Sequence, residues 1–482
     1  MIATCIATQN TEKFIAVLQI SALLLFASCS KSNDLETVDN GSPIGNEALP
    51  PIANAGPDQE IVYPSVNVQL DGSDSNDPDG TISTWSWNEI AGLYSYIRTP
   101  DQAKTSAESL TAGTYLFELT VTDMAGLTAK DTVQITVQGP DFCGDYNNRT
   151  PISAKLVQEG TLSKTYGIAV ATAKDKIFFA GGWSSSGPIS SLVNIYNITS
   201  KTWSAAELSE PREYITAVAN GNKVFFAGGI IAYDDFGGGS ILSDAVDIYD
   251  VEMDIWTQAH LSIEGVGMAA TVVDDKILFA GGSDSSNRGT RVDIYDQSSG
   301  EWTTASLSEN KPWGQAAVTL GNRAYFAGSG FSDKVDIYDA VTGNWSVETM
   351  YEGKASGLAG ITLIDKIYWA GGWTPNPNNH AYQYPSSVIE IWDTSSGNST
   401  LACLKYATGN CMAVQQGDRI VFLSPTIWTG EMTYLDIYDP VADHWYYSSI
   451  PFYIENAISV NGNIYVTVPE NGKTTVSILE FF

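Results

Sequence analysis

Short apolar segments of five to eight residues, each ended by turn residues, recur along most of this chain. The clearest of them reads KIFFAGGW from Lys176, and related runs begin at Lys223, Lys276, Arg323, Lys366 and Arg419. In its first copy the run is the second of four β-rich segments, YGIAVATAKD, KIFFAGGW, SLVNIYN and KTWSAAELS. Four short strands repeated at this spacing are the pattern of a β-propeller blade.

The number of copies of each segment predicts how the ring closes. The third segment occurs seven times, at Val193–Tyr196, Val246–Tyr249, Val292–Tyr295, Val335–Tyr338, Ile389–Trp392, Leu435–Tyr438 and Val476–Leu479. The fourth occurs six times, at Trp203, Trp256, Trp302, Trp345, Ser399 and Trp445. Because an unpaired outer strand would leave an open edge, we expect Ile152–Ser163 to fill the gap and close seven blades. Six blades with a C-terminal hairpin are the alternative.

The Gly pair, the Tyr of VNIYN and the Trp of KTWS resemble the kelch repeat over roughly residues 152–482. The resemblance implies a kelch-type β-propeller, in which the apolar residues of the repeated run pack between blades. The Gly pair is then expected where the backbone turns too tightly for a Cβ atom. The fourth-segment Trp residues are expected to pack within the blades.

A second all-β region precedes the repeats. Residues 51–138 contain alternating segments such as VNVQLDGS, ISTWSWNEI, GTYLFELTVTD and DTVQITVQ, which predict a small β-sandwich. Their sequence resembles the PKD-type immunoglobulin-like module, which implies a spacer or weak binding unit. Four aspartates, Asp71, Asp74, Asp77 and Asp79, suggest either a Ca²⁺ site or ordinary turn chemistry, and their spacing lacks the EF-hand pattern. Residues 139–151 form a linker.

The N-terminus carries the features of a secretory signal. An apolar stretch from Phe14 to Phe26 follows Lys13 and is too short for an ordinary membrane span. The residues Phe26, Ala27, Ser28 and Cys29 resemble a bacterial lipobox, which implies a signal peptide over residues 1–28 and lipidation of Cys29. Residues 29–50 are polar and are expected to form a flexible tether. Ser30 follows the cysteine, so we expect an outer-membrane protein, exposed at the surface or to the periplasm.

The net charge limits the ligands that we expect, and the cysteine content limits the disulfides that we expect. The chain has 482 residues and a net charge of −31, which disfavours binding to nucleic acid. Cys143, Cys403 and Cys411 remain after lipidation and removal of the signal. We expect three buried thiols, with a Cys403–Cys411 disulfide as the less favoured alternative because the two residues fall on an outer and an inner strand.

One face of the propeller is expected to bind a ligand. In an antiparallel blade, the loops between the second and third strands and the links between blades emerge on the same face, and here those loops are long. Loops held on a rigid frame are common binding sites. The binding candidates on this face are Trp183, Arg212, Tyr233, Arg288, Trp313, Trp373, His380, Tyr382 and Trp428, with Lys311 and Lys354 as further positive charges. Aromatic rings beside Asn and Asp suit a glycan or a protein partner.

An enzyme is the rival interpretation. Kelch-like propellers include the galactose oxidase family, whose copper site needs converging His and Tyr ligands, but His260, His380 and His444 fall on separate blades. Sialic acid epimerases also have kelch propellers, and Arg212, Glu213 and Glu264 are in or near links that could face the central funnel. The commoner explanation of such residues is solvated loop charge. The sequence therefore favours a non-catalytic, cofactor-free binding protein anchored by lipid in the cell envelope, with a sugar epimerase or hydrolase as the alternative.

Overall fold

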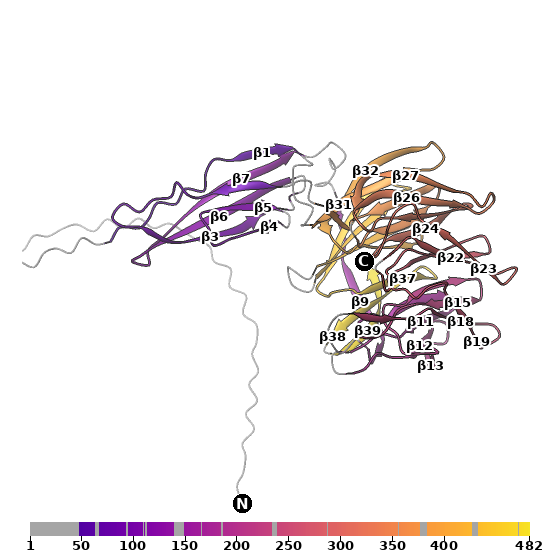
Figure 1. Cartoon of the computed structure of the whole chain (residues 1–482). Coiled ribbons are helices and arrows are strands. Elements are labelled where there is room, and N and C mark those ends of the chain that lie inside the picture. The colour runs from indigo at the N-terminus through magenta and orange to yellow at the C-terminus, as the bar shows by residue number, and fades with distance from the viewer. Residues whose placement is uncertain are drawn as a thin grey trace, which may run out of the picture. The chain divides into compact units, whose positions relative to one another are not determined.

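The computed structural model describes residues 48–62, 67–92, 95–108, 110, 113–138, 149–164, 166–184, 187–233, 239–286, 288–354, 356–375, 383–426, 432–470 and 472–482 (Figure 1). Every regular element in these ranges is a β-strand. In the same ranges, no helix is long and apolar enough to cross a membrane. The predicted signal peptide, Cys29 and most of the predicted tether lie outside the described residues.

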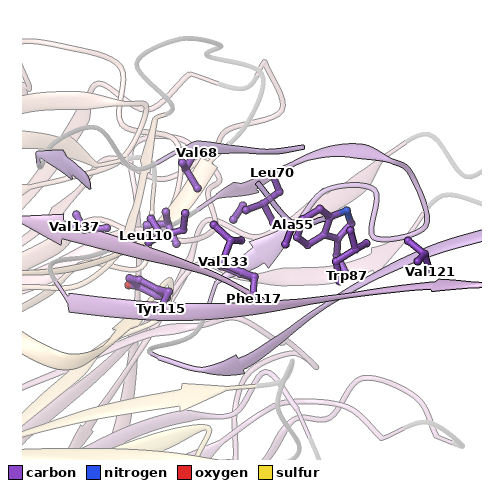
Figure 2. Packing of buried hydrophobic residues seen from close by; sticks show 13 residues of the cluster. Ala55, Val68, Leu70, Trp87, Leu110, Tyr115, Phe117, Val121, Val133 and Val137 are labelled. Carbon is purple, nitrogen blue, oxygen red and sulfur yellow. The ribbon is translucent and has the colours of Figure 1, made fainter. Parts of the chain in front are cut away.

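The first domain is a β-sandwich of two sheets. One sheet has the order β1-β7-β6-β3 and the other β2-β5-β4. The strands are β1 (Gln59–Val62), β2 (Val68–Asp71), β3 (Ile82–Ala91), β4 (Tyr96–Ile97), β5 (Lys104–Glu108), β6 (Gly113–Asp123) and β7 (Thr128–Gln138). In β6, alternate residues are buried, as expected for a strand with one face on the core. Figure 2 shows this core, in which Trp87, Tyr115 and Phe117 are the largest buried side chains.

The aspartates near β2 take part in turn and strand contacts. Asp71 accepts hydrogen bonds from the backbone and hydroxyl of Ser73 and pairs with Lys104 at 2.7 Å. The Lys104 ammonium and the Ser73 groups lower the pKa of Asp71 to about 2. Asp77 accepts the backbone N–H of Asp79 at 3.3 Å, and Asp79 accepts that of Leu49 at 2.8 Å. The Asp71–Ser73 and Asp77–Asp79 bonds are the ones that turn chemistry predicts, whereas Lys104 and Leu49 are distant in the sequence.

The repeats fold into sheets that follow one another along the chain. Seven such sheets are formed by the described residues from 149 onward, each with four strands in order from the innermost to the outermost. The first three sheets are β10 (Ala169–Ala173), β11 (Lys176–Ala180), β12 (Leu192–Asn197) and β13 (Thr202–Glu207); β14 (Thr216–Asn220), β15 (Lys223–Ala227), β18 (Ala245–Asp250) and β19 (Ile255–His260); and β20 (Ala269–Val273), β21 (Lys276–Ala280), β22 (Arg291–Asp296) and β23 (Glu301–Ser306). A hairpin of β16 (Ile230–Tyr233) and β17 (Ser240–Leu242) extends from the second sheet.

The other four sheets repeat this order. They are β24 (Ala316–Leu320), β25 (Arg323–Ala327), β26 (Ser332–Asp339) and β27 (Trp345–Lys354); β28 (Ala359–Leu363), β29 (Lys366–Ala370), β31 (Gln383–Asp393) and β32 (Asn398–Thr408), with β30 (Trp373–Pro375) beside β31; β33 (Met412–Gln416), β34 (Arg419–Thr426), β35 (Met432–Asp439) and β36 (His444–Ile450), with β8 (Thr150–Pro151) beside β36; and β37 (Asn456–Val460), β38 (Asn463–Glu470), β39 (Lys473–Phe481) and β9 (Ala154–Leu162).

The ends of the repeat region meet in the seventh sheet. Strand β9, which precedes the first sheet in the chain, pairs antiparallel with β39 as the fourth strand (Figure 1). The innermost strands of consecutive sheets are neighbours, and β37 of the seventh sheet also contacts β10 of the first. The sheets therefore form a closed ring, and the expected all-β fold of an immunoglobulin-like sandwich followed by a kelch-type propeller is confirmed.

The repeated run packs between sheets, as its pattern predicts. Phe178 contacts the second sheet through Val224 and Phe226, whereas its neighbour Phe179 faces Tyr465 of the seventh sheet. Adjacent strand residues point to opposite faces, so a single run serves both interfaces. On the outer strand, the Trp203 ring lies 4.8 Å from that of Tyr196, and the same Tyr–Trp pair recurs in other sheets.

The Gly pair is required by close backbone contacts. Gly181 has a φ of 68°, and a Cβ atom there would collide with the carbonyl oxygen of Arg212 and lie 2.7 Å from Ile215 Cδ1. We expect Gly181→Ala to lower the free energy of unfolding by about 2–4 kcal/mol, because it adds overpacking to left-handed strain. Gly221, with φ 61° and no atom near its Cβ position, is the matched control and should lose about 1 kcal/mol. Equal losses in urea titrations of the two variants would contradict this explanation.

The cysteines differ from the expectation of three buried thiols. Cys403, on β32, is disulfide-bonded, whereas Cys411 is a free, buried thiol. The expected thiol at Cys403 is therefore wrong, and so is the alternative Cys403–Cys411 pair, because Cys411 keeps its thiol. Cys143 lies outside the described residues.

Candidate functional site

The links between sheets and the loops after the Gly pairs meet on one face of the propeller. Tyr166 and Trp183 exchange backbone hydrogen bonds of 3.2 and 2.9 Å. The equivalent pairs in later sheets are Glu213 with Ile230, Val266 with Ser283 and Ser356 with Trp373. In each pair, the first residue stands three positions before an innermost strand and the second directly follows the Gly pair. These backbone pairs therefore lie at one end of the innermost strands, around the mouth of the central funnel.

A strained tyrosine occupies one of these links. Two residues before the innermost strand, four sheets have Gly167, Gly267, Gly314 and Gly357, with φ between 64° and 70°. The second sheet has Tyr214 at this position, with φ 52°. A bulky residue in this left-handed region is an outlier, and such strain often marks a functional position. The Tyr214 side chain is 44% exposed, so it reaches the surface of the funnel mouth.

Three aromatic side chains, Tyr214 included, gather at this link. The rings of Tyr166 and Trp183 lie 5.4 Å apart, tilted by 41°. Tyr214 joins them through its backbone N–H, which donates to the Gly167 carbonyl oxygen at 3.0 Å. Tyr166 is 40% exposed. These residues come from two consecutive links and one loop, and together they form a partly exposed aromatic platform.

Two carboxylates flank Gly167 beside this platform. The Oε1 atom of Glu455 accepts the Gly167 backbone N–H at 3.0 Å. On the other side, Glu213 Oε2 lies 3.4 Å from where a Cβ atom of Gly167 would be. Glu213 is 1% exposed and accepts a hydrogen bond from the Tyr233 hydroxyl. We call Tyr166, Trp183, Glu213, Tyr214 and Glu455 the mouth site.

Both carboxyl groups have one oxygen without a hydrogen bond. Glu213 Oε2 and Glu455 Oε2 are buried and have no hydrogen-bond partner among the described residues. Burial raises the pKa of Glu213, and it raises the pKa of Glu455 to about 7. A carboxyl group with a pKa near neutral, as at Glu455, can exchange protons, and buried carboxylate oxygens can accept donors from a ligand. Buried oxygens without partners favour such a use, because burial without a hydrogen bond is costly.

Arg212 does not lie at the binding surface where we expected it. Its guanidinium is fully buried, forms an ion pair with Asp247 and donates to the carbonyl oxygens of Gly228 and Ala245 at 2.9 and 2.8 Å. The chain reverses between Arg212 and Tyr214, so the two side chains serve different environments. Arg212 joins consecutive sheets and is not available to a ligand.

The other two positive charges that we expected at the binding surface are also buried in ion pairs. Lys311 is fully buried, lies 3.6 Å from Asp336 and donates to the Lys334 carbonyl at 2.7 Å. Lys354 is 2% exposed and pairs with Glu352. In five sheets, an acidic residue of the third strand accepts a backbone N–H from the end of the preceding sheet; these residues are Asp247, Asp293, Asp336, Glu390 and Asp436. Buried cations accompany this repeated contact, so they are structural.

The remaining described candidates lie at different distances from the mouth site. Tyr233 adjoins it through its bond to Glu213. Trp313 is 42% exposed, stands on the link before β24 and borders Gly267, whereas Trp373 stands in the loop after the Gly pair of the fifth sheet and borders Gly409. Arg288 is exposed and pairs with Asp284 at 3.3 Å within its own loop. His380, Tyr382 and Trp428 lie outside the described residues.

The carboxylates and histidines named in the rival interpretation are also dispersed. Glu213 is buried, which is the opposite of the solvated loop charge that we considered commoner. Glu264 stands on the next link, and its carbonyl accepts a bond from Arg291 at 3.2 Å. His260 pairs with Asp244 at 3.1 Å in the second sheet, and His444 bonds Thr150 at 2.8 Å in the sixth. No group of three or more metal-ligating side chains occurs among the described residues.

Sequence reasoning missed Tyr166, Tyr214 and Glu455. A signal for Tyr214 was present, because aligning the links shows a tyrosine where four other links have glycine. Glu455 carries no such signal, since a glutamate before a strand is ordinary. Its proximity to Gly167 arises from ring closure, which brings together residues 288 positions apart.

Comparisons with known proteins identify both kinds of domain. Residues 55–137 match the family model of the PKD domain, and residues 265–306 match the kelch motif. The human dyslexia-associated protein KIAA0319 is 37% identical over 90 residues, 18% of this chain and 8% of the relative. Human low-density lipoprotein receptor-related protein 11 is 37% identical over 97 residues, 20% of this chain and 19% of the relative.

One relative has a longer match, and two solved structures are similar. The polarized growth protein L1 of Phoma sp. is 26% identical over 190 residues, 37% of this chain and 14% of the relative. This chain thus spans less than a fifth of each of the three curated relatives. The structure of YjhT covers 59% of this chain and 97% of its own, with 16% identity and a TM-score of 0.45. The PKD domain from KIAA 1837 protein covers 20% of this chain and 93% of its own, with 31% identity and a TM-score of 0.18. The chain carries a PKD domain followed by a propeller with a kelch motif.

Proposed function

We propose that this protein is a lipid-anchored cell-envelope protein whose propeller binds a glycan at the mouth site. The observation that carries the proposal is the partly exposed platform of Tyr166, Trp183 and Tyr214 beside two carboxylates with unused acceptor capacity. Aromatic faces pack against the apolar side of a sugar ring, and carboxylate oxygens accept its hydroxyl groups. A protein partner in the envelope is the other occupant that these aromatic residues suit.

The proposed location rests on the N-terminal sequence. The lipobox-like Phe26–Cys29 would place a lipid on Cys29, and the polar residues up to 50 would hold the folded domains away from the membrane. The PKD domain then acts as a spacer between the anchor and the propeller. In this proposal the mouth site faces a glycan or a protein outside the anchoring leaflet, and its binding needs no cofactor.

A glycan-processing enzyme is the second candidate, and a specific observation favours it. Glu455, with a pKa raised to about 7, could exchange a proton near neutral pH, and Glu213 lies on the other side of Gly167. Such a pair would act as acid and base on a sugar bound against the platform. Product formation from a bound glycan, lost in both Glu455→Gln and Glu213→Gln, would favour this candidate over simple binding.

Binding can be tested on a glycan array with the full chain in mild detergent. We expect binding to a defined glycan, and a loss of at least about tenfold in affinity in Trp183→Ala, because this ring is one of the three that form the platform and lies 5.4 Å from that of Tyr166. Phe482→Ala is the matched control, since Phe482 is an exposed ring that directly follows β39.

Trp183→Ala and Phe482→Ala together show where the glycan binds. If Phe482→Ala binds like the unchanged protein and Trp183→Ala does not, the glycan occupies the mouth site. Binding that survives in Trp183→Ala would place the glycan elsewhere. A folded protein that binds no glycan on the array would overturn the proposed function and turn attention to protein partners.

A further inference from the structure

The mouth site is rich in hydrogen-bond acceptors, and its five residues include no cation. Glu213 Oε2 and Glu455 Oε2 are both buried without partners among the described residues. No lysine or arginine in the described ranges forms an ion pair with either glutamate. The nearest arginine in the sequence, Arg212, is committed to Asp247 and to backbone carbonyls. The site therefore has negative charge and acceptor capacity that the described residues do not neutralise.

Such a site discriminates strongly between ligand charges. An anionic sugar would bring a third negative group beside two buried carboxyls, with no guanidinium or ammonium of the site to receive it. A neutral sugar can donate hydroxyl hydrogen bonds but leaves the charge uncompensated. A protonated amine supplies both donors and positive charge, and charge-assisted hydrogen bonds are the stronger kind.

The aromatic residues favour the same ligand. Tyr166, Trp183 and Tyr214 are partly exposed aromatic side chains, Trp183 and Glu213 both border Gly167, and a cation close to an aromatic face is attracted by its quadrupole. A primary ammonium is compact and has three N–H donors, so it can donate to more than one acceptor of the site. On an amino sugar, the ammonium is attached directly to a ring that can pack on the platform, whereas a lysine ammonium is at the end of a flexible chain.

We propose that the mouth site selects a glycan bearing a free primary amine, that is, a sugar unit with an unacetylated amino group. This inference rests on the proposed glycan-binding function and adds the ligand's chemical class. Glu213 and Glu455 receive the ammonium, and the aromatic platform holds the sugar ring. The strained link at Tyr214 positions the phenol near the two carboxylates, whose charges both act on it.

The test compares two oligosaccharides that differ only in the amine. Calorimetric titration of the full chain in detergent with a glucosamine tetramer and an N-acetylglucosamine tetramer should give at least about tenfold tighter binding of the free amine. Glu213→Gln and Glu455→Gln keep the shape of the side chain and remove its charge, so each should lose most of this preference. Glu264→Gln, on the next link, should keep it.

The pH dependence of glucosamine binding is a second test, because a purely structural role of Glu455 would not produce it. Glu455 lies across Gly167 from Glu213, and Tyr453 stands two positions before it on the same link. Burial raises the pKa of Tyr214 and of Tyr453, so these two phenols stay neutral in this range. Between about pH 5 and 7, Glu455 gains up to half of its charge, because its pKa is about 7, while most of the amine stays protonated. Glucosamine binding should therefore tighten as pH rises through this range, and Glu455→Gln should flatten the change.

The results that would overturn the amine preference differ from those that would overturn glycan binding itself. Equal binding of the two tetramers, lost in Trp183→Ala, would overturn the amine preference and leave glycan binding intact. A lysine-rich peptide that binds more tightly than the glucosamine tetramer would overturn the amino sugar as ligand. No binding of either tetramer by a folded protein that binds other glycans would overturn the inference as well. If a glutamine variant fails to fold, the unchanged protein's pH profile and its tetramer preference still decide.

Discussion

Replacing Arg212 with alanine is expected to lower the free energy of unfolding by about 3–5 kcal/mol. The guanidinium is fully buried, pairs with Asp247 and donates to carbonyl oxygens of the second sheet. Its removal leaves the Asp247 carboxylate buried without a counter-charge and takes a donor from the carbonyl oxygens of Gly228 and Ala245, and that loss exceeds the value of the ion pair itself. Urea denaturation followed by tryptophan fluorescence measures the change.

Arg288→Ala is the control for this experiment. Arg288 also pairs with an aspartate, but its side chain is 70% exposed, so the loss should be below about 1 kcal/mol. If Arg212→Ala were as stable as Arg288→Ala, the guanidinium would not hold consecutive sheets together. Its assignment as structural, in place of ligand-binding, would then be wrong.

Replacing Tyr214 with glycine is expected to separate stability from function. Glycine adopts a φ of 52° without the strain of about 1–2 kcal/mol that a larger residue bears there, so stability should be kept or rise by up to about 1 kcal/mol. Glycan binding should fall at least about tenfold, because the phenol at the centre of the mouth site is lost. Thermal unfolding and titration with an array-identified glycan measure the two effects.

Ile364→Gly provides the matched control for strain relief. Ile364 has a φ of 57°, is exposed and stands in the turn between β28 and β29, at the other end of its sheet from the Gly pair. This variant should also keep or gain stability while binding stays unchanged. A Tyr214→Gly protein that is clearly less stable yet binds normally would contradict a functional reason for the strain.

The architecture was largely predictable because it repeats. The same unit of strands, Gly pair and Trp occurs several times, so each copy supports the assignment of the others. The seventh unit lacks a fourth strand, which pointed to Ile152–Ser163, and β9 in this segment pairs with β39. The role of Gly181 was also predictable, since the need for a residue without Cβ follows from a tight turn beside a neighbouring link. Such features depend on local pattern and on the requirement that strand edges be paired.

The candidate site was only partly predictable. Strand order places the loops, so the pattern indicated the face that carries Trp183 and Tyr233. The pattern wrongly placed Arg212, Lys311 and Lys354 at the binding surface, because a charged residue in a link can point either to solvent or between sheets. The acidic partners of Arg212 and Lys311, on β18 and β26, are tens of residues away in the sequence. Glu455 meets its glycine partner only because the ring closes, which no local pattern records.

The most direct test of the central claim is a crystal structure of the protein grown with a glycan selected on the array. We predict ligand density against Tyr166, Trp183 and Tyr214, with a polar group of the sugar within hydrogen-bond distance of Glu213 or Glu455. Density confined to the outer loops around Arg288, with the two carboxylates untouched, would contradict glycan binding at the mouth site.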